Sequence, residues 1–558
     1  MNGINEKKNF VLLVVLDGWG IAQPGAGNAI TLAKTPNFNK LWASYPHTSL
    51  RASGEAVGLP REEAGNTETG HLNLGAGRIV YQDLERINLA IADGSFFENK
   101  ALNSAIDHAI QNNSKLHYLG LLGAGGVHSN VEHLFALIHL AKKRSFSNLY
   151  LHIFTDGRDS PPTASQSYLN QLKEVIAKEG VGQIASIMGR YWSMDRDRRW
   201  NRTEKAYLAL TKGQGSMVKT TEEAIKLSYS EGKTDEFIEP SILTDSSGKP
   251  IALIQDNDAV IFFNFRIDRP RQLTAAFTVD NFKEDSLALD FDPYLEKYEK
   301  THIASKVQHY QKIFLREQKL KNLFFVTMTE YSKSLVDAGT IIAFPPEKVD
   351  LPLGRVISEN GLLQLRMAES EKERFVTYYF NGLRENAFDG EKRIIVPSAN
   401  VLTYDQKPEM SANEITDKLL QEISPDYHYS FVLVNFANPD MVGHTGNIAP
   451  AVKACEVVDT CLGKIANFIL AYGGTLLITA DHGNVEEMIK LQTGQIDTEH
   501  STNPVPFIAV SKEFLGKCQN LQAGILADVA PTVLSLLSIP QPTQMTGRNL
   551  LEAVNGYH

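Results

Sequence analysis

Residues 10–17, FVLLVVLD, are the first of three segments that decide the fold, because each is an apolar run that ends at an aspartate. The other two are FVLVNFANPD at 431–440 and TLLITADHG at 475–483. Short apolar runs that alternate with longer amphipathic stretches are typical of buried parallel strands in α/β proteins. Sites in such folds form beyond the carboxyl ends of the strands. The sequence therefore predicts an α/β protein in which three aspartates converge at one edge of a sheet.

The same pattern predicts four strands, which are Phe10–Leu16, Leu149–Phe154, Ser430–Phe436 and Thr475–Thr479. The chain has 558 residues, which is enough for about three domains of ordinary size. A charged stretch over residues 282–321 and the two prolines at 345 and 346 place a domain boundary near residue 345.

Charge and composition exclude several classes of protein. Lys and Arg number 55 and Asp and Glu number 65, so the net charge is −10 and neither a nucleic acid nor an anionic membrane is expected as a partner. The apolar run near the N-terminus is short, ends at an aspartate and lacks a small-residue cleavage site, which argues against a signal peptide. Cys455, Cys461 and Cys518 are too few for a disulfide scaffold. We expect a cytoplasmic protein with reduced thiols and no membrane span.

A set of candidate metal ligands surrounds the three strand ends. It consists of Asp17, Asp440, His444, Asp481, His482 and His500. Asp440 and His444 are four residues apart, so a single helical turn places both on one face. Oxygen and imidazole ligands suit Mn²⁺, Zn²⁺, Co²⁺ or Mg²⁺ rather than a metal that prefers thiolates, and six ligands suit two ions better than one. The alternative is that each aspartate is only a loop or helix-cap residue.

Residues 65–71, GNTETGH, contain a candidate nucleophile in Thr67, with Thr69 two residues further on. Small residues let the backbone turn sharply and bring amide groups toward a phosphate, and a metal-bound hydroxyl loses its proton far more easily than a free one. Two metal ions beside such a hydroxyl suit phosphoryl transfer. The alternative is that this threonine is a turn residue or a helix N-cap.

Two arginine-rich segments supply positive charge. GRYWSMDRDRRWNR contains Arg190, Arg196, Arg198, Arg199 and Arg202, and FNFRIDRPR contains Arg266, Arg269 and Arg271. Paired guanidinium groups bind phosphate and carboxylate oxygens in a bidentate manner. Because both segments lie far in the sequence from the metal ligands, they predict a second domain that holds an anion. The alternative is a solvated run of charges balanced by Asp195, Asp197 and Asp268.

The motifs together resemble those of the cofactor-independent phosphoglycerate mutases, a family of the alkaline phosphatase superfamily, over essentially the whole chain. They are LDGWG, AKTPNF, GNTETGHLNLGAGRIVYQDL, GGVHSN, FTDGRDSPP, GRYWSMDRDRRW, FFNFRIDR, NFANPDMVGHTGN, TADHGNVEEM and HSTNPVPF, in the order of the family.

The resemblance implies an alkaline phosphatase-like parallel-sheet domain with a second α/β domain inserted. Residues 1–82 and 346–558 would form the metal-binding domain, and residues 83–345 the inserted substrate-binding domain. Two divalent ions are implied, with Mn²⁺ expected and Mg²⁺, Co²⁺ or Zn²⁺ as alternatives. One ion would be held by Asp440, His444 and His500. The other would be held by Asp17, Asp481, His482 and the Thr67 hydroxyl.

The resemblance also implies a substrate site and an activity. The residues that match the family's substrate-binding residues are His128, Arg158, Asp159, Arg190, Arg196, Arg266, Arg269 and Lys372, of which Asp159 and Lys372 are also implied to be catalytic. Asp159 would act as the general acid and base. The implied activity is the glycolytic and gluconeogenic interconversion of 3-phosphoglycerate and 2-phosphoglycerate through a phosphoenzyme on Thr67, without 2,3-bisphosphoglycerate. A monomer is expected.

The clearest departure from the family lies at the nucleophile. The family has a serine in GNSEVGH where this chain has Thr67 in GNTETGH. Threonine keeps the hydroxyl but adds a methyl group that restricts its rotamers. Two alternatives therefore remain open. One is a metal-dependent phosphohydrolase of the same superfamily, and the other is a phosphoglycerate-binding protein that has lost catalysis.

Overall fold

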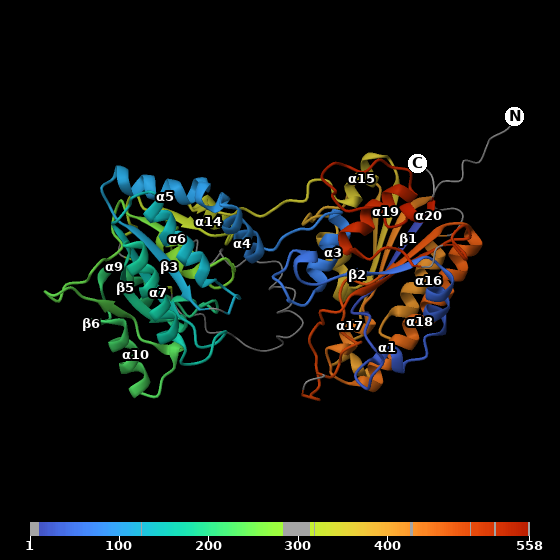
Figure 1. Cartoon of the computed structure of the whole chain (residues 1–558), viewed down its shortest axis with the longest axis horizontal. Coiled ribbons are helices and arrows are strands. Elements are labelled where there is room, and N and C mark those ends of the chain that lie inside the picture. Colours follow the sequence, from blue (N-terminus) through green and yellow to red (C-terminus); the bar gives the residue numbers. More distant parts are fainter. Residues whose placement is uncertain are drawn as a thin grey trace. The chain divides into compact units, whose positions relative to one another are not determined.

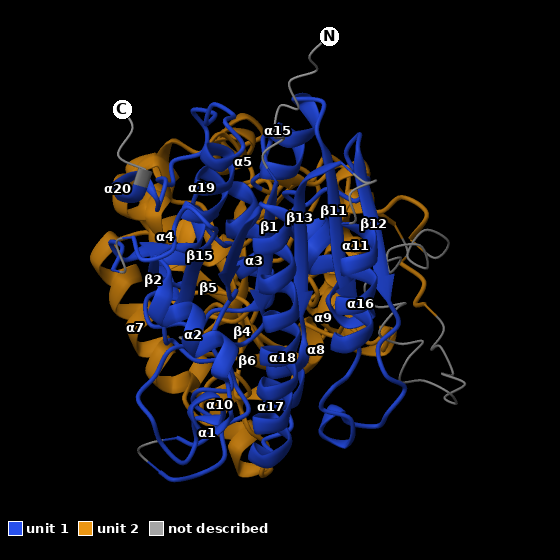
Figure 2. Ribbon diagram, turned by 90° about the vertical axis from the view of Figure 1, so that its right-hand side faces the viewer, with its two compact units in different colours: residues 1–82, 347–558 blue, residues 83–346 orange. Residues whose placement is uncertain are grey.

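The computed structural model describes residues 10–123, 125–282, 313–316, 318–423, 428–490, 493–517 and 520–555. They divide into two compact units (Figures 1 and 2). Unit 1 comprises the described residues of 1–82 and 347–558, and unit 2 those of 83–346. Most of the charged stretch 282–321 and Cys518 lie outside the described residues.

The core of unit 1 is an eight-stranded sheet among the described residues, with the order β12-β11-β13-β1-β14-β15-β2-β16. The strands are β1 (Val11–Leu16), β2 (His47–Arg51), β11 (Leu363–Glu369), β12 (Glu391–Val396), β13 (Tyr429–Phe436), β14 (Thr475–Thr479), β15 (Val505–Val510) and β16 (Gly524–Ile525). The five strands from β12 to β14 are parallel. β1 and β13 are buried along their whole length, as expected for strands covered on both faces.

The helices of unit 1 include two groups that pack together. The described helices are α1 (Ala29–Leu32), α2 (Pro36–Ser44), α3 (Thr67–Ala76), α15 (Leu353–Glu359), α16 (Ala412–Glu422), α17 (Asn438–Gly443), α18 (Ile448–Tyr472), α19 (Val529–Leu536) and α20 (Glu552–Asn555), with the 3₁₀ turn η5 (Ser370–Lys372) after β11. In one group, α18 packs along β14 and against α1, α2, α16 and α17 (Figure 2). In the other group, α3 packs against α15 and α19.

Unit 2 has a second eight-stranded sheet in its described part, with the order β10-β9-β8-β3-β4-β5-β7-β6. The strands are β3 (Leu116–Leu122), β4 (Leu149–Thr155), β5 (Gln183–Gly189), β6 (Ser216–Val218), β7 (Ser241–Leu243), β8 (Ala259–Phe262), β9 (Phe324–Thr327) and β10 (Ile341–Ile342). The helices are α4 (Asp83–Asp93), α5 (Lys100–Gln111), α6 (Val131–Lys143), α7 (Ser165–Glu179), α8 (Arg190–Ser193), α9 (Trp200–Lys212), α10 (Thr221–Ser230), α11 (Arg271–Thr278) and α14 (Lys333–Asp337).

All four predicted strands are confirmed, as β1, β4, β13 and β14. The predicted parallel strands form most of each sheet, and each sheet also contains antiparallel pairs. In unit 1, β15 runs antiparallel to both β14 and β2. In unit 2, β7 runs antiparallel to β5. An apolar strand such as β15 is buried whether it runs parallel or antiparallel to its neighbours, so its composition does not determine the strand direction.

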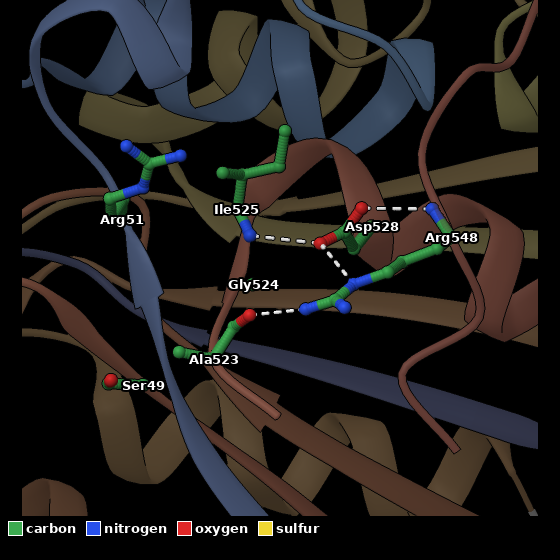
Figure 3. A pocket seen from close by; sticks show the side chains of 7 residues that line it. All are labelled: Ser49, Arg51, Ala523, Gly524, Ile525, Asp528 and Arg548. Atoms are coloured by element: carbon green, nitrogen blue, oxygen red, sulfur yellow. Dashed lines mark hydrogen bonds and ion pairs between the residues drawn. The ribbon is translucent and has the colours of Figure 1, made fainter. Parts of the chain in front are cut away.

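A cavity of about 300 Å³ lies beside the edge strand β16 of unit 1 (Figure 3). It is lined by Ser49, Arg51, Ala523, Gly524, Ile525, Asp528 and Arg548. The Asp528 carboxylate accepts hydrogen bonds from the backbone amides of Ile525 and Arg548, each at 2.9 Å, and so fixes the segments on both sides of the cavity. None of the predicted site residues lines this cavity. None of the described helices has the length and apolar character needed to cross a membrane.

The buried histidine His133 of α6 makes the stability of unit 2 dependent on pH. Its Nε2 lies 2.9 Å from Asn88 Oδ1, and burial lowers the pKa of His133 to about 3. The unfolded chain takes up a proton at about pH 6.5 and the folded chain does not, so stability falls as the pH drops below 6.5. We expect His133→Gln to reduce the stability lost between pH 7 and pH 5 by about 2 kcal/mol. Urea unfolding at both pH values measures this, and equal losses in the two proteins would contradict it.

Candidate active site

The three predicted aspartates lie together at the carboxyl edge of the unit 1 sheet. Asp17 follows β1, Asp440 lies in α17 after β13, and Asp481 follows β14. These three strands are neighbours, with β1 between the other two. The backbone amide of Asp440 donates to the carbonyl of Asp17 at 3.1 Å, which locks two of the strand ends together. All three carboxylates are buried, at 0–1% exposure.

His444 and His500 bring their Nε2 atoms to the carboxylate of Asp440. Each Nε2 lies 3.3 Å from Asp440 Oδ1, and the two Nε2 atoms lie 3.1 Å apart. The other ring nitrogen of each histidine donates to a backbone carbonyl, that of Thr498 for His444 and that of Gly65 for His500. In this tautomer, assigned from the hydrogen bonds, both Nε2 atoms have a free lone pair. Three acceptor atoms therefore face one another.

His482 lies between two groups of potential ligands. Among the described residues, Asp440, His482 and His500 form one group whose ligand atoms lie within 4.8 Å of one another, and Asp17, Asp481 and His482 form another. His482 Nε2 lies 3.6 Å from Asp17 Oδ1 and 3.4 Å from Asp481 Oδ2. Burial lowers the pKa of His482 to about 4, so the ring is neutral near pH 7. The sequence assigned His482 to a single ion, whereas these distances make it a neighbour of both groups.

Thr67, and not Thr69, presents its hydroxyl to these ligands. Thr67 is the first residue of α3, and its Oγ1 lies 2.9 Å from His482 Nε2. His482 Nδ1 donates to the carbonyl of Gly483, so Nε2 is the acceptor and the Thr67 hydroxyl is the donor. The hydroxyl of Thr69 instead donates to the carbonyl and side-chain oxygens of Asn66, the N-cap of the same helix. Of the two threonines, therefore, only Thr67 directs its hydroxyl toward the potential ligands.

Lys372, at the end of η5, joins the threonine to two of the aspartates. Its Nζ donates to Asp17 Oδ1 and Asp440 Oδ2, both at 2.7 Å, and to Thr67 Oγ1 at 3.0 Å. Burial alone would lower the pKa of Lys372, but the charges of Asp17 and Asp440 raise it above its ordinary value. The ammonium group therefore stays charged.

The pKa values of the aspartates reflect this crowding. Burial and the charge of Asp481 raise the pKa of Asp17 well above its ordinary value. Burial would also raise the pKa of Asp440, but the Lys372 ammonium brings it well below its ordinary value. Within this cluster, Asp440 therefore ionises more readily than Asp17.

Three supporting residues were not assigned a role from the sequence. His71, one helical turn after Thr67, donates from Nδ1 to the Thr67 carbonyl at 3.0 Å. Asn435 donates from Nδ2 to Asp17 Oδ2 at 2.7 Å and contacts His71 Nε2 at 3.1 Å. Asn484 donates from Nδ2 to Asp440 Oδ1 at 2.9 Å. Each is a polar residue inside one of the motifs that resemble the family, and that position was the only sequence feature that indicated a role. The partners of each residue could be known only from the fold.

Two observations show that these residues fit bound cations. First, Asp440 Oδ1 and the Nε2 atoms of His444 and His500 are acceptors that converge, an arrangement that a cation stabilises. Second, among the described residues, Lys372 is the only lysine or arginine that pairs with any of the three buried aspartates, and it pairs with Asp17 and Asp440, so negative charge is left uncompensated. Asp481 Oδ2 is also buried without a hydrogen-bond partner. The donor set fits divalent ions such as Mn²⁺ or Zn²⁺.

The substrate residues predicted for the inserted domain gather at the strand ends of unit 2. His128 follows β3, Asp159 follows β4, Arg190 begins α8 after β5, and Arg266 follows β8. These four strands are adjacent in the order β8-β3-β4-β5. The carboxyl ends of adjacent parallel strands thus bring them together, as the rule for open α/β sheets predicts.

His128 lies between two ion pairs. Arg190 is 2% exposed and donates from one terminal nitrogen to Asp156 Oδ1 and Asp159 Oδ2, both at 2.5 Å. The His128 ring lies 3.7 Å from Asp159 Oδ2 on one side and 3.6 Å from Asp268 Oδ1 on the other. Burial, followed by the charge of Arg190, lowers the pKa of His128 to about 4. His128 is therefore neutral near pH 7.

Asp268 is the second carboxylate of this cluster. It accepts a hydrogen bond from Arg196 at 2.5 Å and lies 3.3 Å from Nε of Arg266. Neither Asp268 nor Asp156 was assigned a role in the site from the sequence.

The remaining arginines differ in their surroundings. Arg269 donates to the Met194 carbonyl at 3.1 Å, while its buried Nε has no hydrogen-bond partner. Arg158 is half exposed and lies 3.8 Å from Glu236. Arg199 and Arg202 form ion pairs with aspartates of their own segment. The alternative of a charge run balanced by nearby aspartates therefore describes these two and also Arg196 and Arg266, which pair with Asp268. It does not describe Arg190 or Arg269.

The fold and the two clusters define a class of protein. An α/β sheet with buried Asp and His ligands, a threonine hydroxyl among them and a separate arginine cluster is typical of metal-dependent proteins that transfer phosphoryl groups. A family model described as the BPG-independent PGAM N-terminus matches residues 87–333. The chain belongs to the family of the 2,3-bisphosphoglycerate-independent phosphoglycerate mutases, as relatives matching nearly its whole length show.

Two relatives and one solved structure illustrate the match. The mutase of Moorella thermoacetica is 48% identical over 541 residues, which cover 97% of this chain and 98% of the relative. The mutase of Chloroflexus aggregans is 48% identical over 547 residues, with 97% and 98% covered. A structure of Leishmania mexicana phosphoglycerate mutase at low cobalt concentration is 29% identical, with a TM-score of 0.59 and 98% of each chain covered. The predicted family, fold class and isomerase function are confirmed.

Proposed function

We propose that this mutase interconverts 3-phosphoglycerate and 2-phosphoglycerate through a phosphoryl group held on Thr67. The observation that supports this most strongly is the position of the Thr67 hydroxyl, 2.9 Å from His482 Nε2 and 3.0 Å from Lys372 Nζ. It is buried at the start of a helix, where backbone amides favour a bound phosphate.

The unit 1 ligands would hold two divalent ions, and Mn²⁺ is the metal that we expect. Asp440, His444 and His500 would hold one ion. Asp17, Asp481, His482 and Thr67 would hold the other. When bound, such ions neutralise phosphoryl oxygens and make a hydroxyl easier to deprotonate. His482 belongs to both groups of potential ligands, so metal analysis of its variants is most informative about how the ligands are divided between the ions.

In the first step the Thr67 oxygen forms a bond to the phosphorus of 3-phosphoglycerate, and the bond from phosphorus to the O3 atom of glycerate breaks. The threonine hydroxyl loses its proton, and glycerate O3 gains one. Lys372 Nζ already donates to Thr67 Oγ1, so its charge is placed to stabilise the oxygen as the proton leaves. In the second step the phosphoryl group passes to the glycerate 2-hydroxyl, which loses its proton, and Thr67 is regenerated.

The unit 2 cluster is proposed to bind the phosphoglycerate and to move the glycerate proton. Burial would raise the pKa of Asp159, but hydrogen bonding to Arg190 lowers it below its ordinary value. The carboxylate is therefore ionised at neutral pH, the form that accepts a proton from the 2-hydroxyl. Arg190, Arg196, Arg266 and Arg269, with Arg158 and His128, supply the positive charge and hydrogen-bond donors for the substrate.

Arg269→Lys should weaken the proposed substrate clamp. Lysine keeps the charge but loses the planar pair of donors, and the unpartnered Nε of Arg269 is a donor that a substrate oxygen would satisfy. We expect kcat/KM to fall by a factor that corresponds to about 1–3 kcal/mol. Arg199→Lys is the matched control, because Arg199 pairs with Asp197 at the surface. Equal kinetics of the two variants would remove Arg269 from the site.

A coupled assay tests the proposed function as a whole. It follows 2-phosphoglycerate formed from 3-phosphoglycerate with added Mn²⁺ and without bisphosphoglycerate. Formation of 2-phosphoglycerate without release of inorganic phosphate is the expected result. Release of phosphate alone would favour the phosphohydrolase, and substrate binding without turnover would favour the degenerate binding protein. A monomeric, cytoplasmic enzyme stays a prediction, which sedimentation and cell fractionation would test.

A further inference from the structure

Glu486 is a buried carboxylate that the proposed mechanism does not use. It is 3% exposed and lies five residues after Asp481. The residue falls inside the motif TADHGNVEEM, where the sequence indicated no role for it.

Both carboxylate oxygens of Glu486 accept hydrogen bonds from loops that contain metal-ligand candidates. Oε2 accepts from the backbone amide of Gly20 at 3.0 Å and from that of Asn484 at 2.9 Å. Oε1 accepts from the hydroxyl of Ser501 and, at 3.1 Å, from Asn503 Nδ2. The donors belong to three segments, one after β1, one after β14 and one before β15.

Each of these segments holds at least one of the proposed ligands. Asp17 lies three residues before Gly20, His482 two residues before Asn484, and His500 directly before Ser501. One carboxylate therefore joins three segments that hold ligands from both ion groups.

Asn484 extends this connection to the remaining strand end. Its backbone amide donates to Glu486, while its side chain donates to Asp440 Oδ1 at 2.9 Å. The segment after β13, which holds Asp440, is thus connected to Glu486 through Asn484.

Two glycines allow the backbone to close around the carboxylate. A Cβ atom at Gly20 would lie 2.2 Å from Cδ of Glu486, and one at Gly483 would lie 2.3 Å from its Oε1. Contacts this short mean that a side chain at either position would displace the Glu486 carboxylate. The two glycines therefore leave the space that the Glu486 carboxylate occupies.

We infer that Glu486 is a positioning residue that sets the spacing between the two ion sites by joining the loops of Asp17, His482 and His500. The inference rests on the proposed function, because it takes these residues to be metal ligands. Supporting residues around a metal centre typically change its affinity by about 10–100-fold when they are replaced. Loss of the Glu486 carboxylate should therefore weaken metal binding although no ligand is removed.

The test compares Glu486→Gln with a matched control, Asp459→Asn. Asp459 is also a buried carboxylate of unit 1, and it accepts hydrogen bonds from the backbone amides of Asn37 and Phe38 at 3.2 and 2.7 Å. None of its hydrogen-bond partners lies in a ligand-bearing loop. Mn²⁺ binding to the full chain is measured by calorimetry, together with Tm.

We expect both variants to lower Tm, and only Glu486→Gln to weaken Mn²⁺ binding, by about 10–100-fold. Mn²⁺ affinity within twofold of wild type in folded Glu486→Gln would overturn the inference. If that variant does not fold, Ser501→Ala, which removes one donor and leaves the carboxylate, decides instead. A several-fold loss of Mn²⁺ affinity supports the inference, and unchanged affinity overturns it. A wild-type chain that binds no Mn²⁺ would overturn the metal part of the proposed function and this inference with it.

Discussion

Thr67→Ala is expected to abolish mutase activity, with a fall in kcat of more than about 10³-fold. The variant has no oxygen to accept the phosphoryl group, although the other proposed ligands and the arginine cluster remain. Thr67→Ser is expected to stay active at a rate equal to or above that of the natural protein. Serine keeps the hydroxyl, removes the γ-methyl group and regains rotamer freedom. The coupled assay measures all three rates under one set of conditions.

Thr69→Ala is the matched control for this prediction. Thr69 lies on the same helix, but its hydroxyl bonds to Asn66. We expect its loss to lower stability slightly and to leave most of the activity. Mutase activity that survives in Thr67→Ala but disappears in Thr69→Ala would show that the nucleophile has been assigned to the wrong threonine. A wild type that is inactive until Thr67→Ser is made would favour the degenerate binding protein.

Asp440→Ala is expected to lose both metal and activity, with a fall in kcat of more than about 100-fold. Asp440 Oδ1 faces the Nε2 atoms of His444 and His500, and Oδ2 accepts a hydrogen bond from Lys372. Its removal therefore takes away a ligand and leaves the lysine with one less partner. Metal analysis after dialysis against Mn²⁺, together with the coupled assay, measures both effects.

Asp405→Ala provides the control for the loss of Asp440. Asp405 accepts a hydrogen bond from Asn447, a few residues beyond α17, and contacts none of the proposed ligands. Its variant should keep its metal and its rate. If Asp440→Ala retained full metal occupancy and an unchanged rate, Asp440 could not be a ligand.

The sequence was most informative where burial leaves a simple pattern. β1 and β13 are covered on both faces, so each appears as an uninterrupted apolar run, and the aspartate that ends it was visible at once. β11 was not predicted, because its run LQLRMAE is interrupted by Gln364 and Arg366. Both are fully buried in the fold, where the Arg366 guanidinium lies 4.9 Å from the ring centre of Phe380. The contact that accommodates the buried Arg366 guanidinium comes from a residue elsewhere in the sequence, so no local pattern predicts that this segment is a buried strand.

The candidate site was predictable in its residue types and much less so in its pairings. Ligand-type residues at strand ends can be identified in a sequence, since the topology of parallel sheets brings those ends together. That Lys372 would lie between Asp17 and Asp440 depends on β11 being the neighbour of β13. The resemblance to the family assigned the nucleophile to Thr67 rather than Thr69, but the direction in which the helix presents its first turn could be known only from the fold.

Mass spectrometry of protein quenched during turnover of 3-phosphoglycerate tests the proposed phosphoenzyme on Thr67 without relying on a variant. Trypsin should release residues 62–78 as one peptide, because Arg61 and Arg78 flank it. We expect one phosphate on this peptide, with fragment ions that place it on Thr67, and no phosphate in Thr67→Ala. Phosphate on another residue, or none on this peptide while 2-phosphoglycerate is being formed, would contradict it.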